Sequence, residues 1–169
     1  MNDLLTQINN LKHSIVQKKI QQRILEFKNT DTRSADALFS ELCYCLLTAN
    51  FNAERTIHIH AHLHECFYSD TKQTLSKKLR QNGYRFPNTR AAYIAEAAAY
   101  KDTLPSSIKN LDHEERREWL VNSIKGLGYK EASHFLRNIG YCGLAILDRH
   151  VLRGLFDLKV IDEIPESLS

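Results

Sequence analysis

The sequence predicts an all-α protein. Apolar residues recur at the three- and four-residue spacing of a helix along most of the chain, as at Ile8, Leu11 and Ile15. Only 6 glycines and 3 prolines occur among the 169 residues, too few for the many tight turns of an all-β protein. With 43% hydrophobic residues, a chain of this length can form one compact unit around a buried core, and we expect residues 1–169 to do so.

The first half of the chain divides into at least three helical segments. The apolar stripe of the first continues through Ile24 and Leu25. Ser34 is a preferred N-cap residue and opens a second helix that runs through Leu47. Asn52, another preferred N-cap residue, opens a third.

Residues 57–64 of the third segment fit two secondary structures. Isoleucine, alanine and leucine alternate there with four histidines, which is a strand pattern, but the same residues also form a helical stripe. We favour the helix because both flanks are helical. His58/His62 and His60/His64 then form i, i+4 pairs, a spacing that can bind a metal, but no carboxylate completes either pair. The alternative to a metal site is a polar surface.

The second half begins after a cluster of turn residues at 83–88. Pro87 suits the first turn of a helix that carries residues 91–100, and Pro105 marks the next break. Asp112 and Glu115 have the spacing of a capping box, which predicts a helix through Val121.

Cysteine spacing and hydropathy exclude several classes of protein. The chain has no Cys-x-x-Cys pair, so zinc ribbons and iron–sulfur loops lack ligands, and we expect reduced thiols at Cys43, Cys45, Cys66 and Cys142. No apolar run is long enough to span a bilayer, and the residues after Leu5 are too polar for a signal peptide. We therefore expect an intracellular protein with no membrane partner.

Positive charge is concentrated in the middle of the chain. The net charge is only +3, yet residues 71–101 contain a single acid, Glu96, against seven cations: Lys72, Lys77, Lys78, Arg80, Arg85, Arg90 and Lys101. Such a stretch is either the binding surface for a polyanion or a solvated helix face.

Residues 113–138 have the pattern of a helix-hairpin-helix motif. One helix ends near Ile124, Gly126-Leu127-Gly128 forms a tight turn, and a second helix follows. Glycines at such a turn let a DNA backbone approach, and the amides at the helix N-terminus stabilise a phosphate oxygen without reading base sequence.

Lys130 and Asp148 are the residues best suited to chemistry. Lys130 lies in the first turn of the second hairpin helix, where the helix dipole disfavours a cation. It is either a nucleophile, which must be the neutral amine, or a lysine that contacts phosphate or solvent. Asp148 follows an apolar run and opens another helix, so it can act as N-cap, as a carboxylate beside the amine, or as both.

The sequence resembles archaeal-type 8-oxoguanine DNA N-glycosylase/AP lyase, a branch of the helix-hairpin-helix DNA glycosylase superfamily. The resemblance is most specific at residues 125–138 and 145–150, and extends to 41–51, 83–86 and 161–165. It implies two helical lobes with a DNA cleft between them, one of about residues 31–110 and one of about 1–30 with 111–169. It also implies a monomer that needs no cofactor and binds double-stranded DNA containing oxidised guanine or an abasic site.

The resemblance implies a role for each site residue. Lys130 attacks C1′ of the damaged nucleotide, and the Schiff base permits β-elimination, while Asp148 is the catalytic carboxylate. DNA contacts are implied for Asn50, Arg85, Phe86, Gly126, Leu127, Gly128, Arg149 and His150. Phe86 is either a wedge in the DNA or a core aromatic beside a turn. His134, one turn after Lys130, lies either in the base pocket or in the interior. The carbonyls of Asn122, Ile124 and Leu127 match a cation site in relatives, although Lys125 replaces a common proline.

One departure concerns the C-terminus. Family members continue for several helices past the position where this sequence ends at Ser169, and that segment contacts the oxidised base. We therefore expect the C-terminal helices to be missing. Two alternatives follow from this expectation: an enzyme that cleaves abasic sites only, or a DNA-binding module without turnover.

Overall fold

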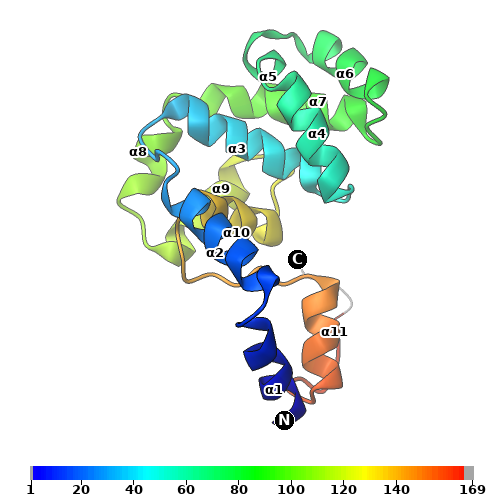
Figure 1. The fold of residues 1–169 in the computed structure, drawn as a ribbon. Helices are drawn as coiled ribbons and strands as arrows, with labels where there is room; N and C mark the ends of the chain where they lie inside the picture. Colours follow the sequence, from blue (N-terminus) through cyan, green and yellow to red (C-terminus); the bar gives the residue numbers. More distant parts are fainter. Residues whose placement is uncertain (1, 166–169) are drawn as a thin grey trace.

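The computed structural model is all-helical over residues 2–165, the residues it describes, with side chains described from residue 5 onward. The predicted fold class is confirmed (Figure 1). The helices are α1 (Asn2–Leu11), α2 (Ile15–Lys28), α3 (Ala35–Thr48), α4 (Ala53–Leu63), α5 (Cys66–Ser69), α6 (Lys72–Gln81), α7 (Pro87–Ala97), the 3₁₀ turn η1 (Ala98–Tyr100), α8 (Leu104–Lys109), α9 (His113–Ser123), α10 (Tyr129–Asn138) and α11 (Arg149–Asp157).

The predicted helix starts are confirmed by their caps. The Ser34 hydroxyl accepts the Ala37 amide at 3.1 Å, and the Asn52 side chain accepts the Arg55 amide at 2.9 Å. Asp112 and Glu115 form both bonds of the capping box. Each bond satisfies a helix N–H group that has no partner within the helix.

Three segments differ from the sequence expectations. The first segment is two helices, because the chain turns at residues 12–14 and Ser14 caps α2. The third segment is three helices, α4 to α6, and the histidine run lies on α4, as we expected. Pro105 lies in the first turn of α8, a short helix that the sequence pattern did not reveal.

The hydrophobic core is centred on α3, which has seven buried residues: Leu38, Phe39, Leu42, Cys43, Cys45, Leu46 and Leu47. Helices α4, α7, α8 and α10 pack against α3, and α9 packs against α10. One cluster of buried side chains runs from Leu38 to Ile139 and so includes parts of both expected lobes. The division into lobes stays a prediction.

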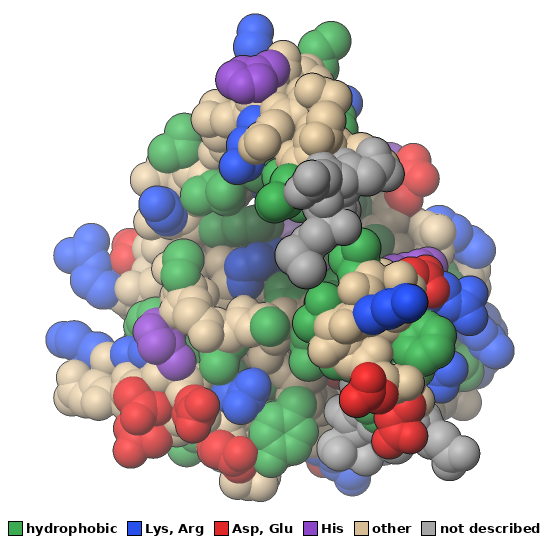
Figure 2. Space-filling model, turned by 90° about the horizontal axis from the view of Figure 1, so that it is seen from below, with side chains coloured by type: hydrophobic (Ala, Val, Ile, Leu, Met, Phe, Trp, Pro, Cys, Tyr) green, Lys and Arg blue, Asp and Glu red, His purple; other side chains and the backbone are tan. Residues whose placement is uncertain are grey.

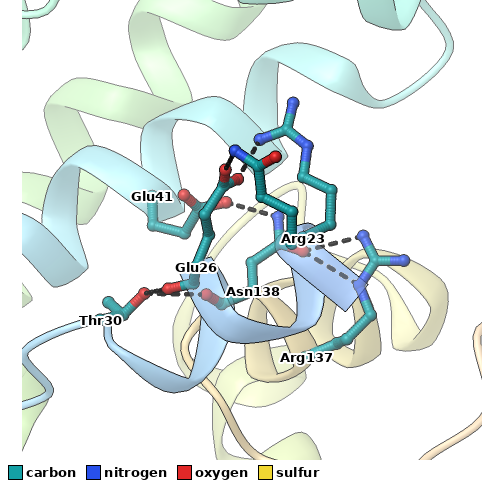
Figure 3. A network of polar contacts seen from close by, with 7 residues as sticks. Arg23, Glu26, Thr30, Glu41, Arg137 and Asn138 are labelled. Atoms are coloured by element: carbon teal, nitrogen blue, oxygen red, sulfur yellow. Dashed lines mark hydrogen bonds and ion pairs between the residues drawn. The ribbon is translucent and has the colours of Figure 1, made fainter. Parts of the chain in front are cut away.

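Helix α2 is attached by polar contacts rather than by a buried apolar face. The Thr30 hydroxyl donates to the carbonyl of Asn138 on α10 at 3.1 Å, and the Asn138 amide donates to Glu41 on α3 at 2.6 Å (Figure 3). Arg137 holds the Asn138 side-chain oxygen with two bonds of 3.0 and 2.8 Å. These contacts tie the residues that follow α2 to the end of α10 and, through Asn138, to the middle of α3.

The apolar stripe of the first segment is largely exposed. No residue of α2 is buried, and Ile15 is 76% exposed. Helix α11 also leaves Val151 and Phe156 exposed. Seen from below, hydrophobic side chains reach the surface between charged ones (Figure 2). None of the helices in the described part of the chain is long and apolar enough to cross a membrane.

Candidate active site

The hairpin between α9 and α10 has the geometry that its sequence predicts. Gly126 has a φ of +87°, in the left-handed region that suits glycine. The Leu127 amide donates to the carbonyl of Ile124 at 3.1 Å, which closes the turn. The Ile124 and Leu127 side chains are buried, so the turn is anchored in the core and its backbone is presented outward.

Lys130 is the second residue of α10, and 43% of its side chain is exposed. Its Nζ lies 3.9 Å from Oε1 of Glu131, the next residue. A carboxylate in the first turn of a helix is favoured by the helix dipole and offsets the unfavourable position of the lysine. The amine is therefore held at the surface, where a ligand can reach it.

Asp148 caps α11 through its side chain. One of its oxygens accepts the amides of His150 and Val151, both at 2.9 Å. The bond from the Val151 amide is the largest cause that lowers the Asp148 pKa, and the charges of His150 and Lys130 add to it. Asp148 is thus a carboxylate with a lowered pKa that forms no ion pair with Lys130 within 4 Å.

Asn50 occupies a tight turn between α3 and α4. Its φ of +58° places it in the left-handed region, which asparagine tolerates better than most residues. The preceding carbonyl, that of Ala49, accepts a 2.8 Å bond from the buried Arg90 guanidinium. The bond from Arg90 therefore fixes the backbone of the turn, while the Asn50 side chain is exposed.

The loop at 83–86 is tied to this turn. Tyr84 donates its hydroxyl to the carbonyl of Leu47 at 2.6 Å, and its ring lies 4.5 Å from that of Phe51. The Arg90 amide also donates to the Phe86 carbonyl at 3.1 Å, so Arg90 bonds to both loops. We call residues 48–52 and 83–86 the paired loops.

Phe86 and Arg85 lie at the outer end of the paired loops. Phe86 is 36% exposed, and the Arg85 guanidinium lies over its ring, 4.8 Å from the centroid. This exposure favours the wedge over the core aromatic, the other interpretation of Phe86.

A cleft of about 360 Å³ joins the paired loops to the hairpin. It brings Asn50 and Phe86 together with Gly126 and with Glu131, the neighbour of Lys130; the other lining residues are Ala49, Thr89, Arg90 and Tyr93. Asn50, Phe86 and Gly126, which come from three distant segments of the sequence, thus border one concave surface, whereas Lys130 and Asp148 are not among its lining residues.

His134 lines a second hollow, of about 510 Å³, one turn along α10 from Lys130. Burial is the main cause that lowers the His134 pKa to about 4, and the charges of Arg137 and Lys130 act in the same direction. The imidazole is neutral at neutral pH. Its ring centroid lies 6.0 Å from that of Tyr44, which lines the same hollow.

The other residues that we expected at the site lie on α11 and in the hairpin. Arg149 and His150 lie exposed in the first turn of α11, beside the Asp148 cap. Of the three hairpin carbonyls, that of Ile124 accepts the Leu127 amide. The ammonium group of Lys125 is 3.2 Å from Glu96.

The histidine run does not gather into a metal site. His60 is half-buried and its Nε2 lies 2.9 Å from the Ser40 carbonyl, while His58 and His62 are exposed. Among the residues that the structure describes, no group of three or more His, Cys, Asp or Glu side chains could hold a metal ion.

Sequence reasoning missed Arg90, Tyr93 and Glu131 as parts of the cleft. Arg90 was one of seven cations in a basic stretch, and only its burial separates it from the others. Glu131 carried a usable signal, since it follows Lys130 directly in the first turn of α10.

The comparisons with known proteins agree with each other. A family model described as 8-oxoguanine DNA glycosylase matches residues 20–169. The 8-oxoguanine DNA glycosylase/AP lyase of Methanocaldococcus jannaschii is 45% identical over 167 residues, which are 98% of this chain and 80% of that protein. The protein of the same name from Korarchaeum cryptofilum is 42% identical over 170 residues, again 80% of its length.

Two solved structures share the fold. The M. jannaschii 8-oxoguanine glycosylase/lyase in complex with a 15-mer DNA containing 8-oxoguanine superposes with a TM-score of 0.91 at 44% identity, covering 98% of this chain and 80% of that one. The 8-oxoguanine DNA glycosylase of Thermotoga maritima gives a TM-score of 0.91 at 38% identity, covering 99% and 80%.

Proposed function

The chain belongs to the 8-oxoguanine DNA glycosylase family, and on that premise we propose that it excises 8-oxoguanine from double-stranded DNA and cleaves the strand at the resulting abasic site. It is a DNA repair enzyme with two activities, N-glycosylase and AP lyase, and it acts as a monomer. The observation that carries this proposal is an exposed lysine, Lys130, in the first turn of the second hairpin helix, together with Asp148, a carboxylate whose pKa the charge of Lys130 helps to lower.

Lys130 is the nucleophile of the reaction. Its neutral amine attacks C1′ of the damaged nucleotide, the C1′–N9 bond breaks, and the base leaves with the bonding electrons and is protonated. The lysine nitrogen then loses a proton, the C1′–O4′ bond breaks, O4′ takes the electron pair and a proton, and a Schiff base between the nitrogen and C1′ remains. Removal of a C2′ proton then expels the 3′ phosphate, which is β-elimination. The lysine supplies the chemistry, so no cofactor is required.

Asp148 stabilises the positive charge that develops on the sugar as the base departs. Its amide partners keep it ionised, and its free oxygen is available to the reacting centre because one oxygen alone accepts both cap bonds. Preorganised charge of this kind is a large part of most enzymatic rate enhancements.

DNA is held by its backbone and opened by the paired loops. The amides around Gly126 and Gly128 hold a phosphate at the N-terminus of α10, and Arg149 and His150 contact the strand beside it. Base extrusion costs a few kcal/mol. Asn50 and Phe86, exposed on the paired loops, fill the space that the base leaves.

His134 contacts the extruded base in the hollow that it lines with Tyr44. The lowered pKa of His134 supports this role, because a neutral imidazole can stack on the extruded base, or donate a hydrogen bond to it and accept one from it, at neutral pH.

Borohydride trapping tests the proposal. The protein is incubated with two labelled duplexes, one with 8-oxoguanine and one with an abasic site, and borohydride reduces any Schiff base to a stable adduct. We expect an adduct on both, lost in Lys130→Gln, while DNA binding of that variant persists. An adduct on the abasic duplex alone would leave an AP lyase, and bound DNA without any adduct would leave a binding module. Strand cleavage by Lys130→Gln would refute the assigned nucleophile.

A further inference from the structure

Most of the local acids near the basic stretch are already paired. Asp70 lies 2.9 Å from Lys78, and Glu96, the sole acid of residues 71–101, lies 3.2 Å from Lys125. Within the part of the chain that the structure describes, no carboxylate lies within 4 Å of Lys72, Lys77 or Arg80. The field of these three cations is therefore not neutralised by a neighbouring ion pair.

The three cations surround one hollow between α6 and the start of α7. Its volume is about 530 Å³, and its lining residues are Lys72, Gln73, Ser76, Lys77, Arg80 and Asn88. No acid is among them. We call this hollow the α6 groove.

A polar network orients the floor of the α6 groove. The side-chain oxygen of Asn88 accepts the Ser76 hydroxyl at 2.6 Å and Nη2 of Arg80 at 2.9 Å. A guanidinium has five N–H donors, so this single bond fixes its direction while most donors stay available. An arginine held in this way loses less freedom when it binds a planar or tetrahedral oxyanion.

The α6 groove lies close to the proposed reaction site. Asn88 is two residues from Phe86 at the tip of the paired loops. Along α7, Asn88 and Tyr93 are separated by five residues, about 7.5 Å at the rise of an α-helix. Tyr93 borders Gly126 of the hairpin. The groove therefore begins at the end of α7 that Phe86 caps, two residues from the proposed wedge.

We propose that the α6 groove binds backbone phosphates of the duplex beside the lesion, outside the reacting nucleotide. This inference rests on the proposed function and adds a second anchoring point for the same DNA. Its ligand is the phosphodiester, because lysine ammonium groups and an oriented guanidinium bind the anionic oxygens of phosphate, the contact that positions a protein on DNA independently of sequence. The groove thus contributes affinity equally to damaged and undamaged DNA.

Salt dependence of binding is the measurement that tests the groove. Each phosphate contact contributes about 0.9 to the slope of log K against log salt on duplex DNA. In the background of Lys130→Gln, which prevents turnover, we expect Lys77→Gln to lower this slope by about 1 and Lys72→Gln/Lys77→Gln by about 2. The loss should be the same for an 8-oxoguanine duplex and an undamaged one.

A charge-matched variant separates a contact from a general field. Lys109 is exposed at the end of α8, and Lys109→Gln removes the same charge as Lys77→Gln. We expect its slope to equal that of the parent. Equal slopes for Lys77→Gln and Lys109→Gln would overturn the groove proposal.

A second readout distinguishes this proposal from the proposed function. With Lys130 intact and enzyme saturating, Lys72→Gln/Lys77→Gln should excise 8-oxoguanine at the parent rate, because the groove does not touch the reacting atoms. A chain that binds with the expected slopes but excises nothing refutes the proposed function alone. A chain that excises normally with unchanged slopes refutes the groove alone.

Discussion

The backbone of Gly126 packs directly against the ring of Tyr93. A Cβ atom at position 126 would overlap the ring carbons of Tyr93, and the φ of +87° would strain any other residue as well. Tyr93 comes from α7, and Phe86 is the N-cap of that helix, so the hairpin that we propose to hold the DNA backbone packs against the helix that positions the proposed wedge. This contact thereby helps to set the spacing between the proposed phosphate site and the proposed wedge.

Gly126→Ala should therefore be more damaging than Gly128→Ala. The left-handed φ alone costs about 1–2 kcal/mol for a non-glycine residue, and displacement of Tyr93 adds to it. Gly128 has a φ of −87°, and a Cβ there would be 3.2 Å from the end of the Glu131 side chain, which can move. We expect urea unfolding to show a loss of at least ~2 kcal/mol at 126 and less than ~1 kcal/mol at 128. Equal losses would contradict the close packing.

Substitutions at Asp148 should separate its role as the cap of α11 from its proposed role in catalysis. Asparagine caps a helix about as well as aspartate, so Asp148→Asn should change the free energy of unfolding by less than ~0.5 kcal/mol, and Asp148→Ala should cost ~1 kcal/mol. Both variants lack the charge beside Lys130, and we expect both to lose strand cleavage by at least ~100-fold in single-turnover assays. Full activity in Asp148→Asn would leave Asp148 with the cap alone.

Stability should fall as the pH is lowered from about 6.5 to 4. His134 has a folded pKa of about 4, below its unfolded value, so the unfolded chain binds a proton in this window and the folded chain does not. Protonation therefore favours unfolding, by at most ~3 kcal/mol for this residue.

The matched variants for this pH effect are His134→Gln and His58→Gln. Replacement of His134 should flatten the dependence of the unfolding midpoint on pH, whereas replacement of the exposed His58 should leave it unchanged. Burial also lowers the His60 pKa, so part of the dependence should persist in His134→Gln. An unaltered dependence in that variant would show that His134 does not titrate in this range.

Tyr84→Phe should loosen the paired loops. It removes the 2.6 Å bond to the Leu47 carbonyl and leaves that buried acceptor without its donor, at a cost of ~1–2 kcal/mol. We expect excision of 8-oxoguanine to slow more than AP-site cleavage, since an abasic site has no base to extrude. Tyr141→Phe, at a half-buried position away from these loops, is the control. A parallel loss of both activities would point to general destabilisation.

Features encoded by adjacent residues could be predicted from the sequence. The caps at Ser34, Asn52 and Asp112 and the turn at Gly126 depend on residues within one helical turn of each other, so their signals survive without tertiary information. The break before α5 was missed because Glu65, which precedes that helix, makes no side-chain cap bond.

Tertiary features were beyond such reasoning. Arg90 and Tyr93 belong to the cleft only because α7 lies against α3 and the hairpin, and no local pattern distinguishes them from solvated neighbours. The apolar periodicity of α2 shows which face is hydrophobic but not whether another element covers it.

The exposed apolar faces of α2 and α11 affect the thermodynamics of unfolding. The large heat-capacity increment of most proteins, ~12–15 cal/mol/K per residue, arises because unfolding hydrates apolar surface that was dry. Side chains such as Ile15 on α2 and Val151 on α11, 76% and 43% exposed, are already hydrated in the folded chain and add little to that increment. The stability curve of this protein should therefore be flatter than its length suggests, with a shallower decline on cooling.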